Sequence, residues 1–446
     1  MTARRLRILL VTSTRGVTEL ASAELKALGY DVDVAEVPDL LFMPPDRLAA
    51  RLGGSVEKYD YIVLPGTYPY SLSGGRGRFV KGPEGLGLLV DVIKVYGPDV
   101  LSPTEAFEKA HPDLLESLAK ARLAELRAKA SPIPSTPPPI SVVSEVPVGR
   151  GQAAEEVESK VTSVVAEGAD YVVIAPMGLD ASEVKRLSED LRGALRGIRL
   201  GVDADQGTLR EVARHFDLLM SVPARSAAED LSWASSREVV VLLGDQDVGL
   251  VRFIERRAEA DRSRPVLDPV ALPSPVPGLF PYLLRLHAIK DVQLPKMIGA
   301  SNVVELMDAD TSGSVALLVS LFAELGGTAV LVEEASPKAR GLTREARAAA
   351  DMVSLALAWG KPAKDVGVSL LNSKLKAREV RSGEVKVEMV GVRDVELRVG
   401  DVTYRIRCDD PCPLRPLLNR LGAAEALKAS LLAYRACLPW SSTWTC

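Results

Sequence analysis

Carboxylate side chains follow an apolar run that the sequence predicts to be a buried strand. The run IRLGVD (Ile198–Asp203) ends at Asp203, and Asp205 and Gln206 begin the loop after it. A carboxylate at a strand end can accept hydrogen bonds from a guanidine-like ligand edge. Asp205 has a second interpretation, as the N-cap of a helix that begins at TLREVA. Because Asp203 belongs to the strand itself, the pattern favours Asp203 as the ligand-binding carboxylate.

A second set of candidates follows the apolar run that ends in VEEAS. Lys338 and Arg340 stand at a predicted helix start, where cations and backbone N–H groups together can bind phosphate or pyrophosphate. Glu333, Glu334 and Ser336 cluster with them at the strand end. The alternative is a set of ordinary exposed charges at a helix end.

A third polar cluster lies in SNVVELMDADTSG, after the run PKMIGAS. The Asn302 amide can hydrogen-bond a heterocycle edge, whereas Asp310 is also a candidate helix N-cap. The three histidines show no motif spacing, and no zinc signature or nucleophile elbow is present.

These candidates lie at the ends of short apolar runs that alternate with helix-like segments eight times. The runs are mostly continuously apolar, as expected for parallel strands that are covered on both faces. They are Ile140–Val146, Tyr171–Pro176, Ile198–Asp203, Phe216–Ser221, Val239–Asp245, Arg264–Pro269, Pro295–Ser301 and Thr328–Ser336.

Eight strand–helix units in roughly 200–250 residues predict an α/β protein built on a closed (β/α)8 TIM barrel. In that fold the chemistry lies at the carboxyl ends of the strands. The fold class therefore places all three clusters at one mouth.

The chain of 446 residues predicts more than one domain. Residues 1–127 are expected to form a Rossmann-like α/β domain, 128–139 a proline-rich extended linker, and 140–361 the barrel. Residues 362–446 are expected to form a small α+β extension with three antiparallel strands and a helix. The glycine-rich loop near Lys81 is interpreted as a turn, because no nucleotide-binding motif is present.

Charge and hydropathy limit the function classes. A net charge of −4 argues against a nucleic-acid-binding surface. The basic N-terminus continues into too short an apolar run for a signal peptide, and Thr311–Val332 is better explained as a buried helix that turns into a strand. We therefore expect a cytoplasmic protein without membrane contact. The four cysteines (Cys408, Cys412, Cys437 and Cys446) all lie near the C-terminus, and their spacing favours ordinary thiols over the alternatives of a structural metal site or a C-terminal disulfide.

In order along the chain, four blocks of this sequence resemble dihydropteroate synthase. They are EGADYVVIAP, GVDADQGTLREVARHFDLLMS, PVLDPVALPSPVPGLFPYLLRL and KMIGASN. GASNVVELMDADTSGSVALLV and LVEEASPKARGLTREARAAADM resemble an archaeal subgroup of related proteins with an extra N-terminal domain and a C-terminal extension.

The resemblance implies a pterin-binding transferase in folate or methanopterin-type cofactor biosynthesis. An arylamine nitrogen attacks the methylene carbon of a dihydropterin methyl pyrophosphate, and pyrophosphate leaves. The implied partners are these two small molecules, with Mg2+ as a cofactor and a homodimer as an assembly.

Residue by residue, the resemblance implies a pterin site. Asp203 matches the aspartate of the Ser-Val-Asp strand, and Asp268 that of Asp-Pro-Gly, whose glycine is replaced by Val270. Ser221 stands in the place of an asparagine, and Asn302 follows the retained Ser301 where the family has arginine.

The phosphate-binding candidates that would replace the missing cations are Ser336, Lys338 and Arg340. Glu145, in the region of the family's metal-binding asparagine, is the candidate Mg2+ ligand. Because several family cations are absent, two alternatives stay open. One is methyl transfer from a reduced pterin, and the other is a catalytically inactive binding or scaffold barrel.

Overall fold

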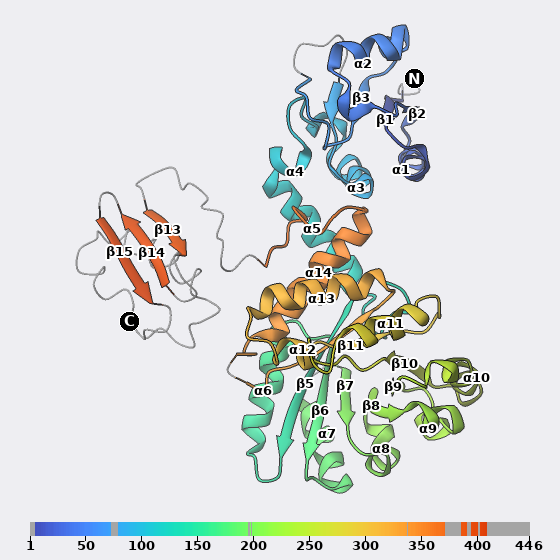
Figure 1. The fold of residues 1–446 in the computed structure, drawn as a ribbon, viewed down its shortest axis with the longest axis vertical. Helices are drawn as coiled ribbons and strands as arrows, with labels where there is room; N and C mark the ends of the chain where they lie inside the picture. The colour runs from blue at the N-terminus through green and yellow to red at the C-terminus, as the bar shows by residue number, and fades with distance from the viewer. Residues whose placement is uncertain are drawn as a thin grey trace. The chain divides into compact units, whose positions relative to one another are not determined.

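The computed structural model describes residues 5–72, 79–194, 197, 199–336 and 338–370 and the strands at 385–389, 394–399 and 402–407. The chain divides into two compact units, 1–369 and 370–446. The first contains an N-terminal α/β sheet and a barrel, and Figure 1 labels their elements. The expected domain boundaries within it stay predictions.

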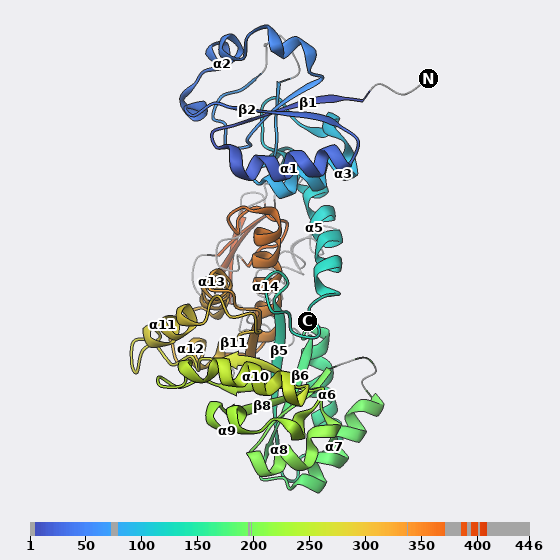
Figure 2. The ribbon, with the colours of Figure 1, turned by 90° about the vertical axis from the view of Figure 1, so that its right-hand side faces the viewer.

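The N-terminal sheet has four parallel strands in the order β2-β1-β3-β4. Helices α1 and α3 cover one face, and α2 lies on the other (Figure 2). The order 2-1-3-4 differs from the 3-2-1-4 order of a Rossmann dinucleotide-binding half. The expected Rossmann-like character is therefore not confirmed. The elements are β1 (Arg7–Thr12), α1 (Arg15–Ala27), β2 (Asp31–Glu36), α2 (Pro45–Leu52), β3 (Tyr61–Leu64), β4 (Phe79–Lys81), α3 (Leu86–Tyr96), α4 (Phe107–Ala110) and α5 (Pro112–Arg127).

The second sheet has eight parallel strands in the order β10-β9-β8-β7-β6-β5-β12-β11. It closes where the Leu267 N–H donates to the Pro295 carbonyl at 2.8 Å, beside a single bridge from Leu267 to Lys296. The expected eight-stranded parallel barrel is thus present, nearly closed. Its strands are β5 (Ser141–Gly149), β6 (Tyr171–Met177), β7 (Arg199–Asp203), β8 (Leu218–Pro223), β9 (Glu238–Leu242), β10 (Arg264–Asp268), β11 (Met297–Gly299) and β12 (Ala329–Glu333).

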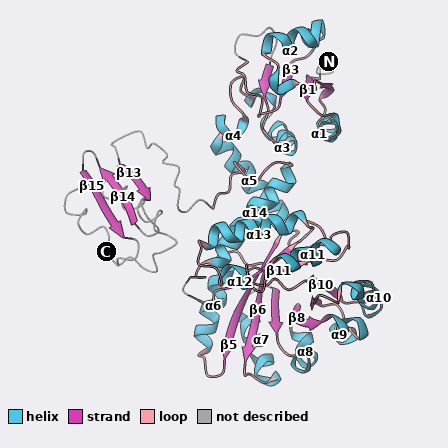
Figure 3. Cartoon of the chain, in the orientation of Figure 1, coloured by secondary structure: helices cyan, strands magenta, loops and turns pink. Residues whose placement is uncertain are grey.

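Helices surround these strands (Figure 3). They are α6 (Ala154–Ala166), α7 (Ala181–Ala194), α8 (Gln206–Val212), α9 (Ala224–Glu229), α10 (Val251–Asp261), α11 (Phe280–Ala288), α12 (Ser301–Val304), α13 (Thr311–Glu324) and α14 (Leu342–Trp359). The barrel interior holds a core of buried side chains that includes Val143, Tyr171, Met220, Val266 and Met297.

The proline-rich segment is not a free spacer, because it closes the N-terminal end of the barrel. Ile133 is buried in the interior core, and its N–H donates to Glu238 Oε1 at 2.7 Å. Tyr171 donates its hydroxyl to the other oxygen of the same carboxylate at 2.6 Å. The apolar side chain between the prolines explains why this segment folds onto the barrel.

Helix α14 belongs to two cores. Its N-terminal half packs on the barrel, where Arg347 pairs with Asp170 at 2.8 Å. Its C-terminal half carries Trp359 into the core of the N-terminal sheet, where the indole N–H donates to Asp91 Oδ2 at 2.9 Å. A Cβ at Gly87 would come within 2.7 Å of the Ala358 carbonyl oxygen, so this close approach requires glycine.

The second unit contains the three predicted antiparallel strands, β13 (Val385–Met389), β14 (Asp394–Val399) and β15 (Val402–Arg407). The predicted C-terminal helix and the four cysteines lie outside the described residues. Among the described helices, none combines the length and the apolar character that a membrane span requires.

Candidate functional site

Four carboxyl groups stand at the carboxyl end of the barrel. Val143 and Val266 belong to the interior core, and alternation along a strand puts Glu145 and Asp268, two residues later, on the same inner face. Asp203 pairs with interior Met220, and Glu333 pairs with Glu145 across β12 and β5. Electrostatic interactions link Asp203 to both Glu145 and Asp268, so these groups share one mouth.

Asp203 is held by its neighbour on β8. The Ser221 side chain hydrogen-bonds the Asp203 carboxyl, which lowers the pKa of this group, while burial raises it more strongly. Ser221 has a φ of +67°, and the β8–β9 register shifts between Leu219 and Val222. A strand irregularity of this kind changes the direction in which a side chain points, and such irregularities are frequent at functional sites.

Asp268 is buried, with 6 % of its surface exposed. Burial raises its pKa to about 6, and Arg285 opposes this shift. One carboxyl oxygen accepts the Val270 N–H at 2.8 Å. Val270 has a φ of +56°, the left-handed conformation that glycine favours and that a β-branched residue rarely adopts.

Arg285, from α11, fastens the turn after Asp268. Its Nε donates to the Pro269 carbonyl at 2.9 Å and one Nη to the Val270 carbonyl at 3.1 Å, while the other Nη pairs with Asp245. All three nitrogens of the guanidinium are therefore occupied by the ends of β9 and β10.

Glu145 and Glu333 form an acidic pair at the same level of neighbouring strands. Burial, together with the charges of Asp203 and Glu333, raises the pKa of Glu145 to about 8. Burial and Glu305 also raise the pKa of Glu333. Glu145 is thus mostly protonated near neutral pH, when it can donate a hydrogen bond to a ligand. The described residues contain no group of three or more histidine, cysteine or carboxylate ligands that would hold a metal ion.

The predicted phosphate-binding residues are partly engaged elsewhere. The Lys338 ammonium donates to the carbonyls of Val304 and Glu305, at 2.9 and 3.3 Å, and to that of Met307. Ser336 donates to Glu305 Oε1 at 2.9 Å. Arg340 is exposed, and within the described part of the chain it makes no hydrogen bond or ion pair. Phosphate binding here stays a prediction, and Arg340 is its accessible cation.

Ser301 and Asn302 lie at the start of α12, beside the same mouth. The Ser301 hydroxyl accepts the Glu333 N–H at 2.7 Å and so ties α12 to the end of β12. Asn302 donates its amide to the Ala271 carbonyl at 3.3 Å. Asn302 is exposed and fastens the segment after Asp268. Both contacts position the strand ends that carry the carboxyl groups.

The two alternative assignments as helix caps are confirmed. Asp205 accepts the N–H groups of Gly207 and Thr208 at 2.9 and 3.1 Å, so it caps α8. Asp310 accepts the Ser312 N–H at 3.3 Å at the start of α13.

Sequence reasoning missed Arg285 and Tyr282, both on α11. Tyr282 is fully buried, and its pKa is raised well above its ordinary value by burial and by the Asp268 charge. A signal was present, because Tyr282 and Arg285 stand three residues apart, on one face of a mostly apolar helix.

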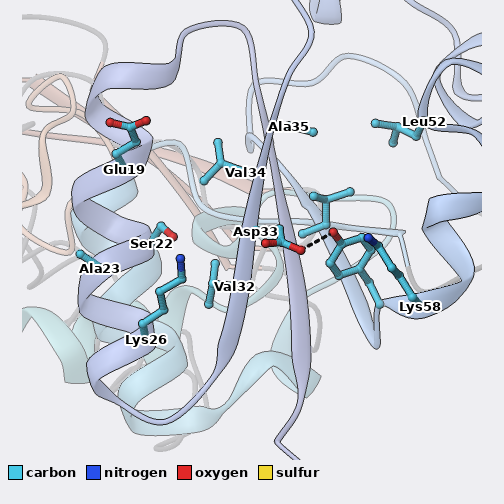
Figure 4. A pocket seen from close by; sticks show the side chains of 12 residues that line it. Glu19, Ser22, Ala23, Lys26, Val32, Asp33, Val34, Ala35, Leu52 and Lys58 are labelled. Atoms are coloured by element: carbon cyan, nitrogen blue, oxygen red, sulfur yellow. Dashed lines mark hydrogen bonds between the residues drawn. The ribbon is translucent and has the colours of Figure 1, made fainter.

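A cavity of about 580 Å3 lies elsewhere, around the edge strand β2 of the N-terminal sheet. Figure 4 shows Lys26 and Ser22 of α1 on one side of β2 and Asp33 and Lys58 on the other. Asp33 accepts the Tyr59 hydroxyl at 2.5 Å, and the lysines are exposed. This cavity therefore has neither the buried carboxyls nor the strand-end geometry of the barrel mouth.

No family model matches the chain. An uncharacterized protein of Methanocaldococcus jannaschii is 22 % identical over 450 residues, which cover 91 % of this chain and 85 % of that protein. This relative has no assigned activity, and the identity is too low to show a family.

Solved structures similar to the chain include dihydropteroate synthases. The Vibrio fischeri enzyme is 16 % identical with a TM-score of 0.38 over 49 % of this chain and 94 % of its own. The Thermus thermophilus enzyme is 19 % identical with a TM-score of 0.36 over 48 % and 92 %. The Xanthomonas albilineans enzyme, solved with 4-aminobenzoic acid, is 17 % identical with a TM-score of 0.37 over 48 % and 90 %. Scores this low do not establish a shared fold, and the barrel assignment comes from its own strand pairing.

Proposed function

We propose that the chain is a pterin-binding transferase of the dihydropteroate synthase type and that the mouth of its barrel is the pterin site. The observation that carries the proposal is the Asp203 carboxyl, held by Ser221 beside buried Asp268. The amino group and ring N–H of a pterin lie along one edge and can donate two parallel hydrogen bonds to a carboxylate. The order of the strand-end blocks in the sequence adds independent support.

The reaction proposed first joins a dihydropterin methyl pyrophosphate to an arylamine. The amine nitrogen forms a bond to the methylene carbon, the bond from that carbon to the pyrophosphate oxygen breaks, and the nitrogen loses a proton. Holding the two reactants together is the main task of the protein in such a step. Asp203 and Asp268 would orient the pterin, and Arg340 would attract the pyrophosphate.

Glu145, after losing its proton, would supply a carboxylate oxygen to the expected Mg2+. A bound divalent cation neutralises charge on a departing pyrophosphate. Because a cation lowers the pKa of a neighbouring carboxyl, Mg2+ binding at Glu145 would release a proton near neutral pH.

Methyl transfer from a reduced pterin is a second candidate, and the charge of the mouth favours it. Four carboxyl groups line the mouth, while Arg285 and Lys338 are held by protein groups. A pterin without a pyrophosphate meets less electrostatic repulsion there.

Calorimetric titration of the purified full-length chain tests these proposals. A 6-hydroxymethyl pterin is added in one series, and pyrophosphate with Mg2+ in another. Binding of both supports the condensation reaction, and binding of the pterin alone supports methyl transfer. Binding of neither overturns both enzyme proposals and leaves the scaffold alternative.

A further inference from the structure

Tyr282 carries a hydroxyl that nothing in the surrounding protein explains. It lies in the first turn of α11, is fully buried, and its oxygen has no hydrogen-bond partner among the described residues. A buried hydroxyl without a partner destabilises a fold, and phenylalanine would fill the same space without that penalty. The hydroxyl therefore points to a state of the site in which it has a partner.

The charged group that raises the pKa of Tyr282 is Asp268. One oxygen of the Asp268 carboxyl accepts the Val270 N–H, and the other makes no hydrogen bond within the described residues. Arg285, one helical turn after Tyr282 on α11, contacts the Pro269 and Val270 carbonyls directly after Asp268, so the Tyr282 hydroxyl and the Asp268 carboxyl lie in the same region.

Arg285 restricts how these two groups can meet. It holds the Pro269 and Val270 carbonyls, and the Val270 N–H is held by Asp268 itself. Because the turn is fastened at three backbone groups, rotation of the Asp268 carboxyl is an easier movement than a change of the backbone. Such a rotation turns the unpaired oxygen toward a new donor, while the two Arg285 contacts hold the turn.

We propose that Tyr282 is a positioning residue whose hydroxyl donates to Asp268 when a heterocycle occupies the mouth, and that this contact holds the carboxyl toward the ligand. The inference rests on the proposed pterin site and deepens it. Without a ligand, the buried Tyr282 hydroxyl lacks a hydrogen-bond partner, which lowers the stability of the fold. With a ligand bound, the hydroxyl donates to Asp268, so the fold gives up stability in exchange for tighter binding.

The test is Tyr282→Phe in the full-length chain. We expect an unchanged or higher melting temperature, because an unpaired buried hydroxyl is removed, and pterin affinity about 10-fold lower, because a hydrogen bond to a charged acceptor is lost. Tyr68→Phe is the matched control. The Tyr68 hydroxyl donates to the Met43 carbonyl at 2.7 Å in the N-terminal sheet, so its loss should lower the melting temperature and leave pterin affinity unchanged.

A double-mutant cycle separates positioning from packing. Asp268→Asn keeps an oxygen for the Val270 N–H and removes the charged acceptor. Tyr282→Phe should then change pterin affinity less than about 2-fold in the Asp268→Asn background, because the hydroxyl acts through Asp268. An equal loss in both backgrounds, or no loss in the wild-type background, overturns the inference while the pterin site stands. Absence of pterin binding by the wild-type chain overturns the proposed site and this inference together.

Discussion

The hydroxyl of Ser221 hydrogen-bonds the carboxyl of Asp203 from the neighbouring strand, and it does so from a left-handed backbone with a φ of +67°. A regular strand would send the side chain of residue 221 away from the barrel interior, because interior Met220 precedes it. The contact therefore depends on the irregularity in β8, which the fold keeps at a conformational cost of about 1–3 kcal/mol.

Two substitutions at residue 221 distinguish the effect of its left-handed backbone from the effect of its hydroxyl group. Ser221→Gly and Ser221→Ala both remove the hydrogen bond, but only glycine relieves the left-handed backbone. We expect the glycine variant to be more stable than the alanine variant by about 1 kcal/mol, as measured by urea unfolding. In both variants the pKa of Asp203 should rise further. Pterin binding needs the ionised Asp203 carboxylate and is lost as the pH falls through its pKa. In both variants this loss should therefore occur at a higher pH than in the wild-type chain. Equal stability of the two variants would contradict the role assigned to the backbone.

Asp203 and Asp205 give a matched pair for the pterin site. Asp203→Asn should weaken pterin binding by at least about 10-fold, because the charged acceptor of two hydrogen bonds is lost. Asp205→Ala removes a helix cap and should cost about 1 kcal/mol of stability with unchanged affinity. Calorimetry and thermal unfolding of both variants check this. Normal affinity of Asp203→Asn would show that the pocket lies elsewhere.

The pKa of about 8 at Glu145 makes the stability of the fold depend on pH. The folded chain keeps a proton that the unfolded chain has released, so the free energy of unfolding should fall as pH rises from about 5 through 8 and then level off. Glu145→Gln cannot ionise and should reduce that fall. Glu155→Gln, at an exposed position of α6, is the control. Thermal unfolding across this pH range measures both, and identical pH profiles for the two variants would refute the burial of an uncharged Glu145.

We expect Lys338 to contribute to the stability of the fold and Arg340 to contribute to pyrophosphate binding. Lys338→Met leaves three backbone carbonyls without their ammonium donor and should lower stability by about 1–3 kcal/mol. Arg340→Ala should change stability by less than about 0.5 kcal/mol and should weaken pyrophosphate binding. Chemical unfolding and calorimetry with pyrophosphate distinguish them. A stable Lys338→Met variant that no longer binds pyrophosphate would reverse these assignments.

The barrel strands were predictable because each is a short apolar run whose two faces are both buried. β6 begins at Tyr171 in the prediction and in the structure, and β10 begins at Arg264 in both. The ends were less predictable. The run expected to reach Asp245 stops at Leu242, because Gly244 and Asp247 form a turn there, with the Gly244 N–H donating to Asp247 at 2.9 Å.

The candidate site was predictable only in part. Strand-end carboxylates such as Asp203 are visible in a linear pattern, since a polar residue ends an apolar run. The contacts of Lys338 are not, because the carbonyls that it binds lie 31 to 34 residues earlier in the chain. The left-handed Val270 is also hidden, since nothing local marks a valine for that backbone. Tertiary contacts from Arg285 and Asn302 hold its turn.

The shared helix α14 has a consequence for how this chain can be divided. Leu355 and Trp359 complete the core of the N-terminal sheet, and Ile133 closes the barrel from within the segment before residue 140. A fragment of residues 140–361 would therefore lose Ile133, which closes one end of the barrel. It would also expose the apolar side chains of Leu355 and Trp359. Val366, beyond α14, belongs to the same core, so folding and ligand studies need the chain from its first strand through Val366 as one piece.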